Sequence, residues 1–552
     1  MMRQATSFVS LFVTFILATA SACASGKGAL VTSAATTEAT ADQSPKGTTP
    51  ASFIQVEGAD LNARLDAAAR RARTDNRQTP YWTVYSFDVR PGVAVDPDGG
   101  EFHGSMNGFG GIYIFTGTNA AGMTVETRNL GVFILRSVGS NAITRMEVYN
   151  LDRKREYASY PVYSAGRASN DESLSFLRGL AEGAPATSAN KPGLLNERAA
   201  LAVALHDDPR VNDILKNFVR TSQNRGVRSS SVYWLGQLGG ETQFLASLVT
   251  NQSEDQNLRR AAAHAIGESR DRAALSTLQT VYDRVTEREL RKAIVHAAAE
   301  NDDKDAALAF LLRVAKADAD VEVRKAAVHG LGEMGGERAI AELMNIYAAD
   351  QSLELKRTVL HSLSEIESPR ASERITTVAR DANENLELRR TAIHILGERE
   401  SDATTAELIK IYDTDRNREV RQTVLHALSE TKGQRAEDKL FEIARGGDDA
   451  QLRSTAIHIL GERADRRSLA LLSDTMDSNS ADTQVQIQAL HAISERPAEE
   501  SVPLLLKAAK SHPNAQVRRA AIHWLGESGD PRALEFFHQV LTSKPGEDKE
   551  EK

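Results

Sequence analysis

A histidine recurs nine times in the second half of the chain, at steps of 32 or 33 residues, and a glutamate stands four residues after each one. Residues i and i+4 share one face of a helix, so each pair could place an imidazole beside a carboxylate. Such a pair can bind a metal ion or recognise a polar ligand. It can also satisfy its own hydrogen-bonding groups at a half-buried interface between repeats. The histidines are His264, His296, His329, His361, His394, His426, His458, His491 and His523. The glutamates run from Glu268 to Glu527, and we call the two rows together the His/Glu ladder.

Three interpretations of the ladder compete. A zinc site needs three or four ligands, so two ligands on one helix would require a second helix to close each site. In the structural interpretation, each histidine contacts its own glutamate or that of a neighbouring unit and seals the stack. In the third, the histidine row contacts a ligand directly. The sequence favours the structural interpretation, and we assign no metal and no cofactor.

A second row accompanies the histidines. The position four residues before the histidine is basic in six copies, namely Arg260, Lys292, Lys325, Arg357, Arg390 and Arg519. One interpretation is a solvated face balanced by the glutamates. The other is a groove of cations and imidazoles, which would suit an acidic or extended peptide.

The elements that position these residues are helices. A period this regular marks a solenoid, in which each unit buries its apolar face only against its neighbours. In the last copy, Val517, Ala521 and Leu525 fall on one helical stripe, whereas His523 lies off it. A second helix follows with Asp530 as N-cap and Pro531 at its first position.

The repeat resembles the HEAT repeats, in particular the subgroup named after phycobilisome lyases. Their V-R-x-x-A-x-x-x-L-G element is matched here by Val323, Arg324, Ala327, Leu331 and Gly332. The match covers about ten units, from residue 227 to the C-terminal helix, with a weaker extension over 196–220. The resemblance implies an α-solenoid that binds proteins on its concave side, where the ladder would lie.

The repeats also alternate in type. Copies with glycine three residues after the histidine, such as Gly332 and Gly397, interleave with copies that carry serine, such as Ser364 and Ser429. The true unit of the later half is therefore a pair of hairpins spaced by 64 or 65 residues. Duplication of such a pair favours a scaffold over an enzyme.

The N-terminus reads as an export signal. Arg3 precedes an apolar run over Phe8–Leu17 and small residues up to Ala22, and the only cysteine, Cys23, follows directly. This context resembles a bacterial lipoprotein signal, with Cys23 as the lipidated residue. The alternative is ordinary cleavage after Ala22. Either way we expect an exported protein, periplasmic, anchored to the envelope or secreted, in which no internal disulfide can form.

The segment between the signal and the repeats predicts a small α+β domain. We expect a helix over Ala59–Arg73, strands over Tyr81–Val89, Gly111–Phe115, Thr124–Leu135 and Ile143–Tyr149, and a closing helix near Asp171–Leu180. A glycine-rich loop over 96–111 lacks the features of a phosphate cradle. His103 with Asp96 and Asp98 in that loop is most simply a solvated histidine.

These features define the expected organisation: a signal peptide over 1–24, a flexible linker over 25–52, the α+β domain over 53–182, a mainly α solenoid over 196–543 and a tail over 544–552. The β-rich domain should cap one end of the stack. We expect Phe536, Phe537 and Leu541 to close the other.

The sequence indicates an interaction protein rather than an enzyme. A formal charge of −8 over 552 residues gives no reason to expect nucleic acid as a partner. The metal-dependent hydroxylases built on HEAT-like repeats carry adjacent His-Glu pairs, and this sequence has none. We therefore predict an exported, non-catalytic scaffold for an unknown protein or peptide, either attached to a membrane by lipid at Cys23 or released by ordinary cleavage. The alternative is a metal-binding or lyase-like enzyme that uses the ladder.

Overall fold

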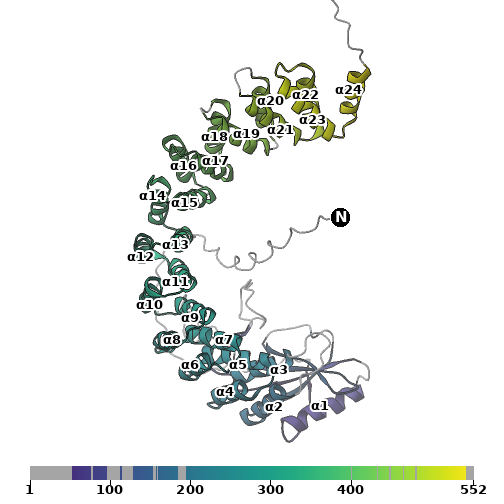
Figure 1. The fold of residues 1–552 in the computed structure, drawn as a ribbon. Helices are drawn as coiled ribbons and strands as arrows, with labels where there is room; N and C mark the ends of the chain where they lie inside the picture. The colour runs from purple at the N-terminus through teal and green to yellow at the C-terminus, as the bar shows by residue number, and fades with distance from the viewer. Residues whose placement is uncertain are drawn as a thin grey trace, which may run out of the picture. The chain divides into compact units, whose positions relative to one another are not determined.

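The computed structural model describes residues 53–542 except 76–78, 96–111, 115–127, 153–156, 158–159, 184–193, 400, 432, 447–448, 464 and 479–481. The signal, the linker, Cys23, His103 and the tail lie outside the described residues. The described part is mainly helical, with 24 helices, and begins with a small mixed domain (Figure 1). None of the described helices is both long enough and apolar enough to cross a membrane.

The small domain is built on a five-stranded sheet. Its order is β1-β7-β2-β5-β6, with β1 over Ile54–Gln55, β7 over Val162–Arg167, β2 over Tyr81–Ser86, β5 over Leu130–Arg136 and β6 over Ile143–Asn150. Strand β7 runs parallel to β1 and β2, and the other pairs are antiparallel. A separate pair joins β3 (Val93–Val95) to β4 (Ile112–Ile114). Strands β1 and β7 are parallel, so the chain between them must return across the sheet before β7 begins. Helix α1 (Leu61–Asp75) lies in this connection and packs on the sheet.

The two faces of the sheet follow from the alternation in β2. Tyr81 packs beside Tyr163 with the alanines of α1, whereas Trp82 and Val84 pack with Phe133 in a separate aromatic cluster. The strand predicted over Tyr81–Val89 ends at Ser86, because Phe87 to Val89 turn away toward the solenoid, where Val89 pairs with His206. Strand β7 was not predicted.

The solenoid consists of eleven helical hairpins that stack in two layers. Successive odd-numbered helices pack closely, whereas successive even-numbered helices share fewer neighbours, so the odd-numbered layer is the inner one (Figure 1). The inner helices are α3 (Leu194–Ala204), α5 (Arg225–Leu238), α7 (Gln256–Glu268), α9 (Arg288–Glu300), α11 (Val321–Met334), α13 (Leu353–Glu365), α15 (Leu386–Glu398), α17 (Arg418–Glu430), α19 (Ala450–Gly461), α21 (Thr483–Ser494) and α23 (Ala515–Glu527).

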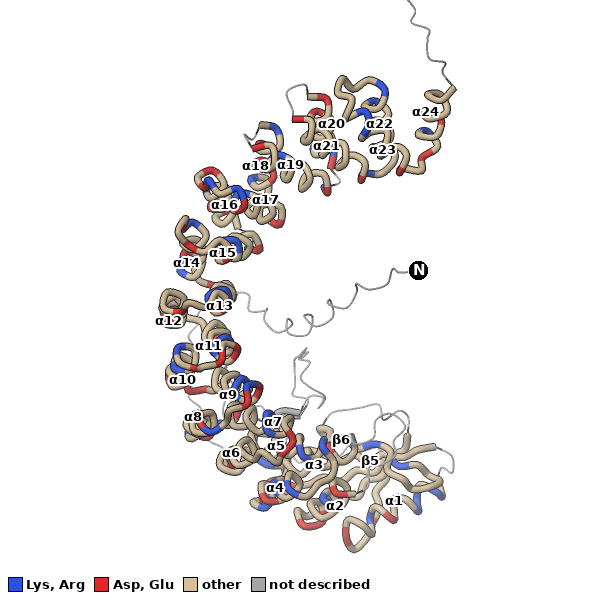
Figure 2. The backbone as a smooth tube through the Cα atoms, viewed as in Figure 1, with Lys and Arg blue, Asp and Glu red and all other residues tan. Residues whose placement is uncertain are grey.

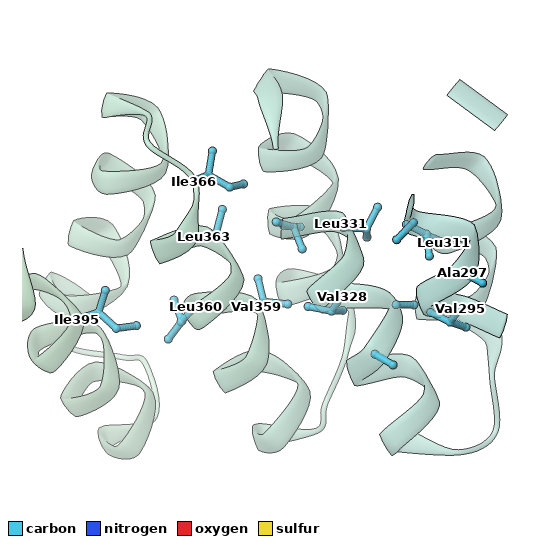
Figure 3. Packing of buried hydrophobic residues seen from close by; sticks show 14 of the residues in the cluster. Val295, Ala297, Leu311, Val328, Leu331, Val359, Leu360, Leu363, Ile366 and Ile395 are labelled. Carbon is cyan, nitrogen blue, oxygen red and sulfur yellow. The ribbon is translucent and has the colours of Figure 1, made fainter. Parts of the chain in front are cut away.

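The outer helices alternate with them. They are α4 (Val211–Thr221), α6 (Thr242–Thr250), α8 (Ala274–Tyr282), α10 (Lys304–Ala317), α12 (Gly336–Ala349), α14 (Pro369–Arg380), α16 (Asp402–Thr414), α18 (Gln434–Gly446), α20 (Arg466–Asp477), α22 (Ala498–Ser511) and α24 (Pro531–Thr542). The buried residues of both layers form one continuous core along the stack, which Figure 3 shows from Val295 through Val328 and Leu360 to Ile395. Burial therefore runs along the whole solenoid and not within each hairpin.

Side-chain caps fix where the inner helices begin. Nine of them, from α5 to α23, start after a residue whose side chain accepts a hydrogen bond from an amide of the first turn, namely Asn224, Asp255, Asp320, Ser352, Asn385, Asn417, Asp449, Asp482 and Asn514. Such caps satisfy amides that the helix itself leaves without a partner. On these nine helices the cap at the N-terminal end thus fixes where the helix begins, and the ladder residues lie at the other, C-terminal end.

The two ends of the stack differ. Helix α2 (Asn170–Glu182) and strand β6 pack on α3, and Arg198 pairs with Glu147 there. At the C-terminal end Phe536 is buried, but Leu541 is 84% exposed. The expectation that Leu541 closes this end is wrong, because α24 buries Ala533 and Phe536 and packs the partly buried Phe537 against the core, whereas Leu541 faces solvent.

Candidate binding surface on the inner helices

All nine histidines of the ladder lie near the C-terminal ends of inner helices, one on each helix from α7 to α23. None of them is buried, and the side chain of His394 is 54% exposed. The residues on either side of His394, Ile393 and Ile395, are buried in the core. The helical period thus separates a packed stripe from a half-exposed one that carries the imidazoles.

The histidines contact carboxylates on their own helix. The distance from Nε2 to Oε1 is 3.5 Å for His394 and Glu398, and it is 3.8 Å for His329 and Glu333. His458 and His491 contact their own glutamates at 3.7 Å. At these separations each contact is an ion pair only while the histidine is protonated.

Three histidines also reach the glutamate of the next inner helix. His329 Nδ1 lies 3.4 Å from Glu365 Oε2, and His394 Nδ1 lies 3.4 Å from Glu430 Oε2. His264 Nδ1 lies 3.9 Å from Glu300, and this contact lowers the pKa of Glu300. His329 and His394 therefore each sit between two carboxylates, one from each of two adjacent repeats.

The cross-repeat contacts occur where a glycine lets two inner helices approach closely. A Cβ at Gly332 would lie 2.7 Å from Ser362 Cβ, and one at Gly397 would lie 2.8 Å from Ala427 Cβ, closer than real Cβ atoms come. The same holds for Gly267 with Ala297 and for Gly461 with Ala492. Each observed cross-repeat His–Glu contact spans one of these close interfaces. The glycine copies of the repeat thus bring the next helix within reach of the histidine.

The serine copies have a different following interface. At the close interfaces, the residue directly after the histidine of the following helix is small, for example Ala427 or Ser362. On the helices that follow the serine copies, the same position holds Ile395, Ile459 or Trp524. Correspondingly, α13 and α15 pack less extensively than α15 and α17. Trp524 instead contacts the ring of His491, at a centroid distance of 4.7 Å. From α11 onward close and open interfaces alternate, which gives the pairing of hairpins in the later half a physical basis.

The basic row lies on the same inner helices, two turns before the glutamates. Lys325 Nζ lies 3.0 Å from Glu322, and Arg390 Nη1 lies 3.5 Å from Glu387, both acids being in the first turn of the same helix. Lys292 pairs in the same way with Glu289, and Arg260 donates to Asn257. Arg357 and Arg519 occupy the corresponding positions of α13 and α23. Lys292, Lys325 and Arg390 therefore pair with first-turn acids rather than with the ladder.

A row of arginines one residue earlier was not recognised in the sequence as an inter-repeat contact. Arg259 is buried, donates to the carbonyl of Val249 at the end of the preceding outer helix, and pairs with Glu287 at 2.9 Å. Arg389 does the same with Ala379 and Asp415. The pairs Arg228–Glu254, Arg291–Asp318 and Arg324–Asp350 belong to the same row. The signal was present as an arginine followed 26 to 28 residues later by an acid.

A buried histidine outside the ladder was also missed. His206 Nε2 lies 2.8 Å from Ser173 Oγ, which in turn contacts the hydroxyl of Tyr85 at 3.2 Å, and Phe87 stacks on the imidazole. Burial lowers the pKa of His206 to about 4. The group joins the small domain to the solenoid, and nothing in the local sequence around His206 indicates it.

The described residues contain no group of three or more His, Cys, Asp or Glu side chains that could hold a metal ion. Each of His329 and His394 contacts two carboxylates that come from two different helices, and these contacts include no ligand of another type. What the ladder offers chemically is a line of half-exposed carboxylates and imidazoles. It can donate and accept hydrogen bonds along several repeats.

Comparison with known proteins addresses the fold. The family model described as HEAT repeats matches residues 308–387, 379–461 and 472–551. These residues form HEAT repeats. A search of curated proteins finds no sequence match.

Solved structures resemble this HEAT-repeat chain at low identity. Human deoxyhypusine hydroxylase is 16% identical over 47% of this chain and 95% of its own, with a TM-score of 0.21. The complex of CpcE and CpcF of phycocyanin lyase from Nostoc sp. PCC7120 is 19% identical over 42% of this chain and 94% of its own, with a TM-score of 0.23. The karyopherin Kap121p bound to the SUMO protease Ulp1p is 15% identical over 67% of this chain and 46% of its own, with a TM-score of 0.36. The chain spans less than half of that karyopherin, and these likenesses concern the helical repeat alone.

Proposed function

We propose that this chain is an exported, non-catalytic scaffold that binds a protein partner along its inner helices. HEAT-repeat solenoids are typically protein-binding scaffolds. The observation that carries the proposal is the half-exposed His/Glu ladder, which recurs on every inner helix from α7 to α23. A ligand that spans several repeats would gain one similar contact from each.

The location is proposed from the N-terminal sequence. An apolar run followed by small residues and Cys23 supports export, with the cysteine as a lipid attachment point. The composition of residues 25–52 suits a tether that would hold the solenoid away from a membrane surface. A partner in the same compartment follows from this placement.

The test compares two double variants of the tagged, full-length protein. His361→Ala with His426→Ala removes two exposed imidazoles from the inner helices, and Arg374→Ala with Lys410→Ala removes two exposed cations from the outer helices α14 and α16. Envelope proteins enriched by the wild type should be retained by the outer variant and reduced with the inner variant. Equal enrichment by wild type and both variants would contradict binding along the inner helices.

A further inference from the structure

The acidic half of the ladder occupies positions that helices normally avoid. Glu365, Glu398 and Glu430 are the last residues of α13, α15 and α17, and Glu462 and Glu495 are the C-caps of α19 and α21. The C-terminal end of a helix carries a partial negative charge, which disfavours acidic side chains there. Every inner helix from α7 to α23 nevertheless carries a glutamate at this end. Breaks of a local rule of this kind are expected at functional positions.

The charges around this row leave it negative. Residues of both signs occur along the whole solenoid (Figure 2), so the pairing within each repeat decides the local charge. In the described part of the chain, every ion-pair contact of these carboxylates is to a histidine, for example Glu365 to His329 and Glu430 to His394. Lys325 and Arg390 of the basic row lie two turns away from the glutamates and pair with first-turn acids. Arg399, in the turn after α15, donates to the carbonyls of Leu363 and Ser364.

The carboxylates are available to a ligand. The side chains of Glu333, Glu365, Glu398 and Glu430 are 53, 47, 58 and 45% exposed, and each contacts its histidine through one oxygen. Four carboxylates on four consecutive inner helices thus face solvent with a shared negative field.

We infer the form of the partner from the general spacing of packed helices. Neighbouring packed helices lie about 8 to 10 Å apart. A polyproline II segment rises about 3.1 Å per residue with three residues per turn, so every third side chain returns to the same face after about 9 Å. An extended β-strand, in contrast, turns every second side chain to one face.

We propose that the inner helices α11 to α17 bind an extended, cationic segment of a partner that carries Lys or Arg at every third residue in a polyproline II conformation. Its cations lie against Glu333, Glu365, Glu398 and Glu430 in turn. This inference rests on the proposed function and specifies the chemistry of the partner. The sequence left an acidic or extended peptide as the partner, and the placement of charges favours a cationic one.

The test measures binding of labelled peptides to the full chain by fluorescence anisotropy. A peptide of four Lys-Pro-Pro units places its lysines at every third residue. A second peptide of the same composition clusters the lysines in pairs, and a third replaces them with glutamate. The regular cationic peptide should bind at least fivefold more tightly than the clustered one, the acidic peptide should not bind, and added salt should weaken binding.

Matched variants locate the site. Glu365→Gln with Glu398→Gln should weaken the regular peptide about tenfold. Glu373→Gln with Asp474→Asn, which removes two exposed acids from the outer helices α14 and α20, should leave binding unchanged. Circular dichroism and melting show that both variants fold, and the inner variant should melt no lower than wild type, because it removes charge from helix C-termini.

Equal affinity for the two cationic peptides, equal loss in both variants, or preference for the acidic peptide would each overturn the inference. The proposed function fails separately. If the envelope partner still depends on His361 and His426 while none of the peptides binds, then the scaffold stands and the cationic partner falls. If binding of the envelope partner is also unchanged by substitutions on the inner helices, both the proposed function and the cationic partner are wrong.

Discussion

At the scale of single residues, His394 shows what the ladder does for stability. Its imidazole lies between Glu398 and Glu430 but is more than half exposed, so its contacts are those of a surface ion pair. We expect His394→Ala to lower the free energy of unfolding by about 0.5 kcal/mol. His523→Ala is the control, because α23 is the last inner helix among the described residues. A loss above about 2 kcal/mol for His394→Ala, with no such loss for His523→Ala, would instead show that His394 belongs to the packed interface between repeats.

His206 makes a different prediction, because it is buried. Its pKa is about 4 in the folded protein, against about 6.5 in an unfolded chain. Above pH 6.5 both states hold a neutral imidazole, and between pH 6.5 and 4 only the unfolded state takes up the proton. Stability should therefore fall by roughly 3 kcal/mol across that window. Thermal melts from pH 7 to 4 should show a shallower fall in His206→Gln, and parallel curves would refute this role.

Cys23 tests attachment. If it carries lipid, the wild type partitions with membranes and Cys23→Ser appears in the soluble fraction, because the anchor is lost. Fractionation of cells that express each form decides between lipidation and ordinary cleavage. Equal solubility of the two forms would eliminate the anchor.

At the scale of elements, the close interfaces depend on glycine. Gly397 meets Ala427, so Gly397→Ala should push α15 from α17 and destabilise the protein by about 2 kcal/mol. Gly526, the equivalent residue of the last inner helix, has nothing within 4 Å of an added Cβ. Gly526→Ala should therefore stabilise by about 0.5 to 1 kcal/mol through helix propensity. Denaturant unfolding of the two variants checks this, and equal effects of the same sign would contradict the account.

How much of these elements could be predicted differs between the two parts of the chain. The hairpins follow from a local period, because each inner helix carries the same stripe of apolar residues ahead of its histidine. The alternation of glycine and serine was visible, but its meaning depends on which residue of the next helix faces it, such as Ala427 for Gly397. Strand β7 was missed because its parallel pairing with β1 joins residues more than a hundred positions apart.

For the candidate site, the histidines, glutamates and cations were all found in the sequence, yet their pairing was not. From the sequence alone, Lys325 could pair with a glutamate of the ladder or with an acid in the first turn of its helix. The structure places it 3.0 Å from Glu322, in the first turn. The contact of His329 with Glu365 depends on how closely two helices approach. Distances between repeats are set by packing, which a one-dimensional pattern does not contain.

At the scale of the whole molecule, the solenoid is a stack of two layers with distinct surfaces. The inner layer carries the ladder, and the outer layer carries exposed charges such as Arg374 and Lys410. The small domain packs on α3, so a long partner can run along the inner helices from α7 onward. The account therefore predicts contact over several repeats on one layer.

Site-specific photo-crosslinking tests this central claim most directly. A photoreactive amino acid is placed at 361 or 426 on the inner helices and at 374 or 410 on the outer helices of the full-length protein, and the cells are irradiated. The account predicts that one partner is captured from both inner positions and from neither outer position. Capture from the outer positions with none from the inner ones would contradict it.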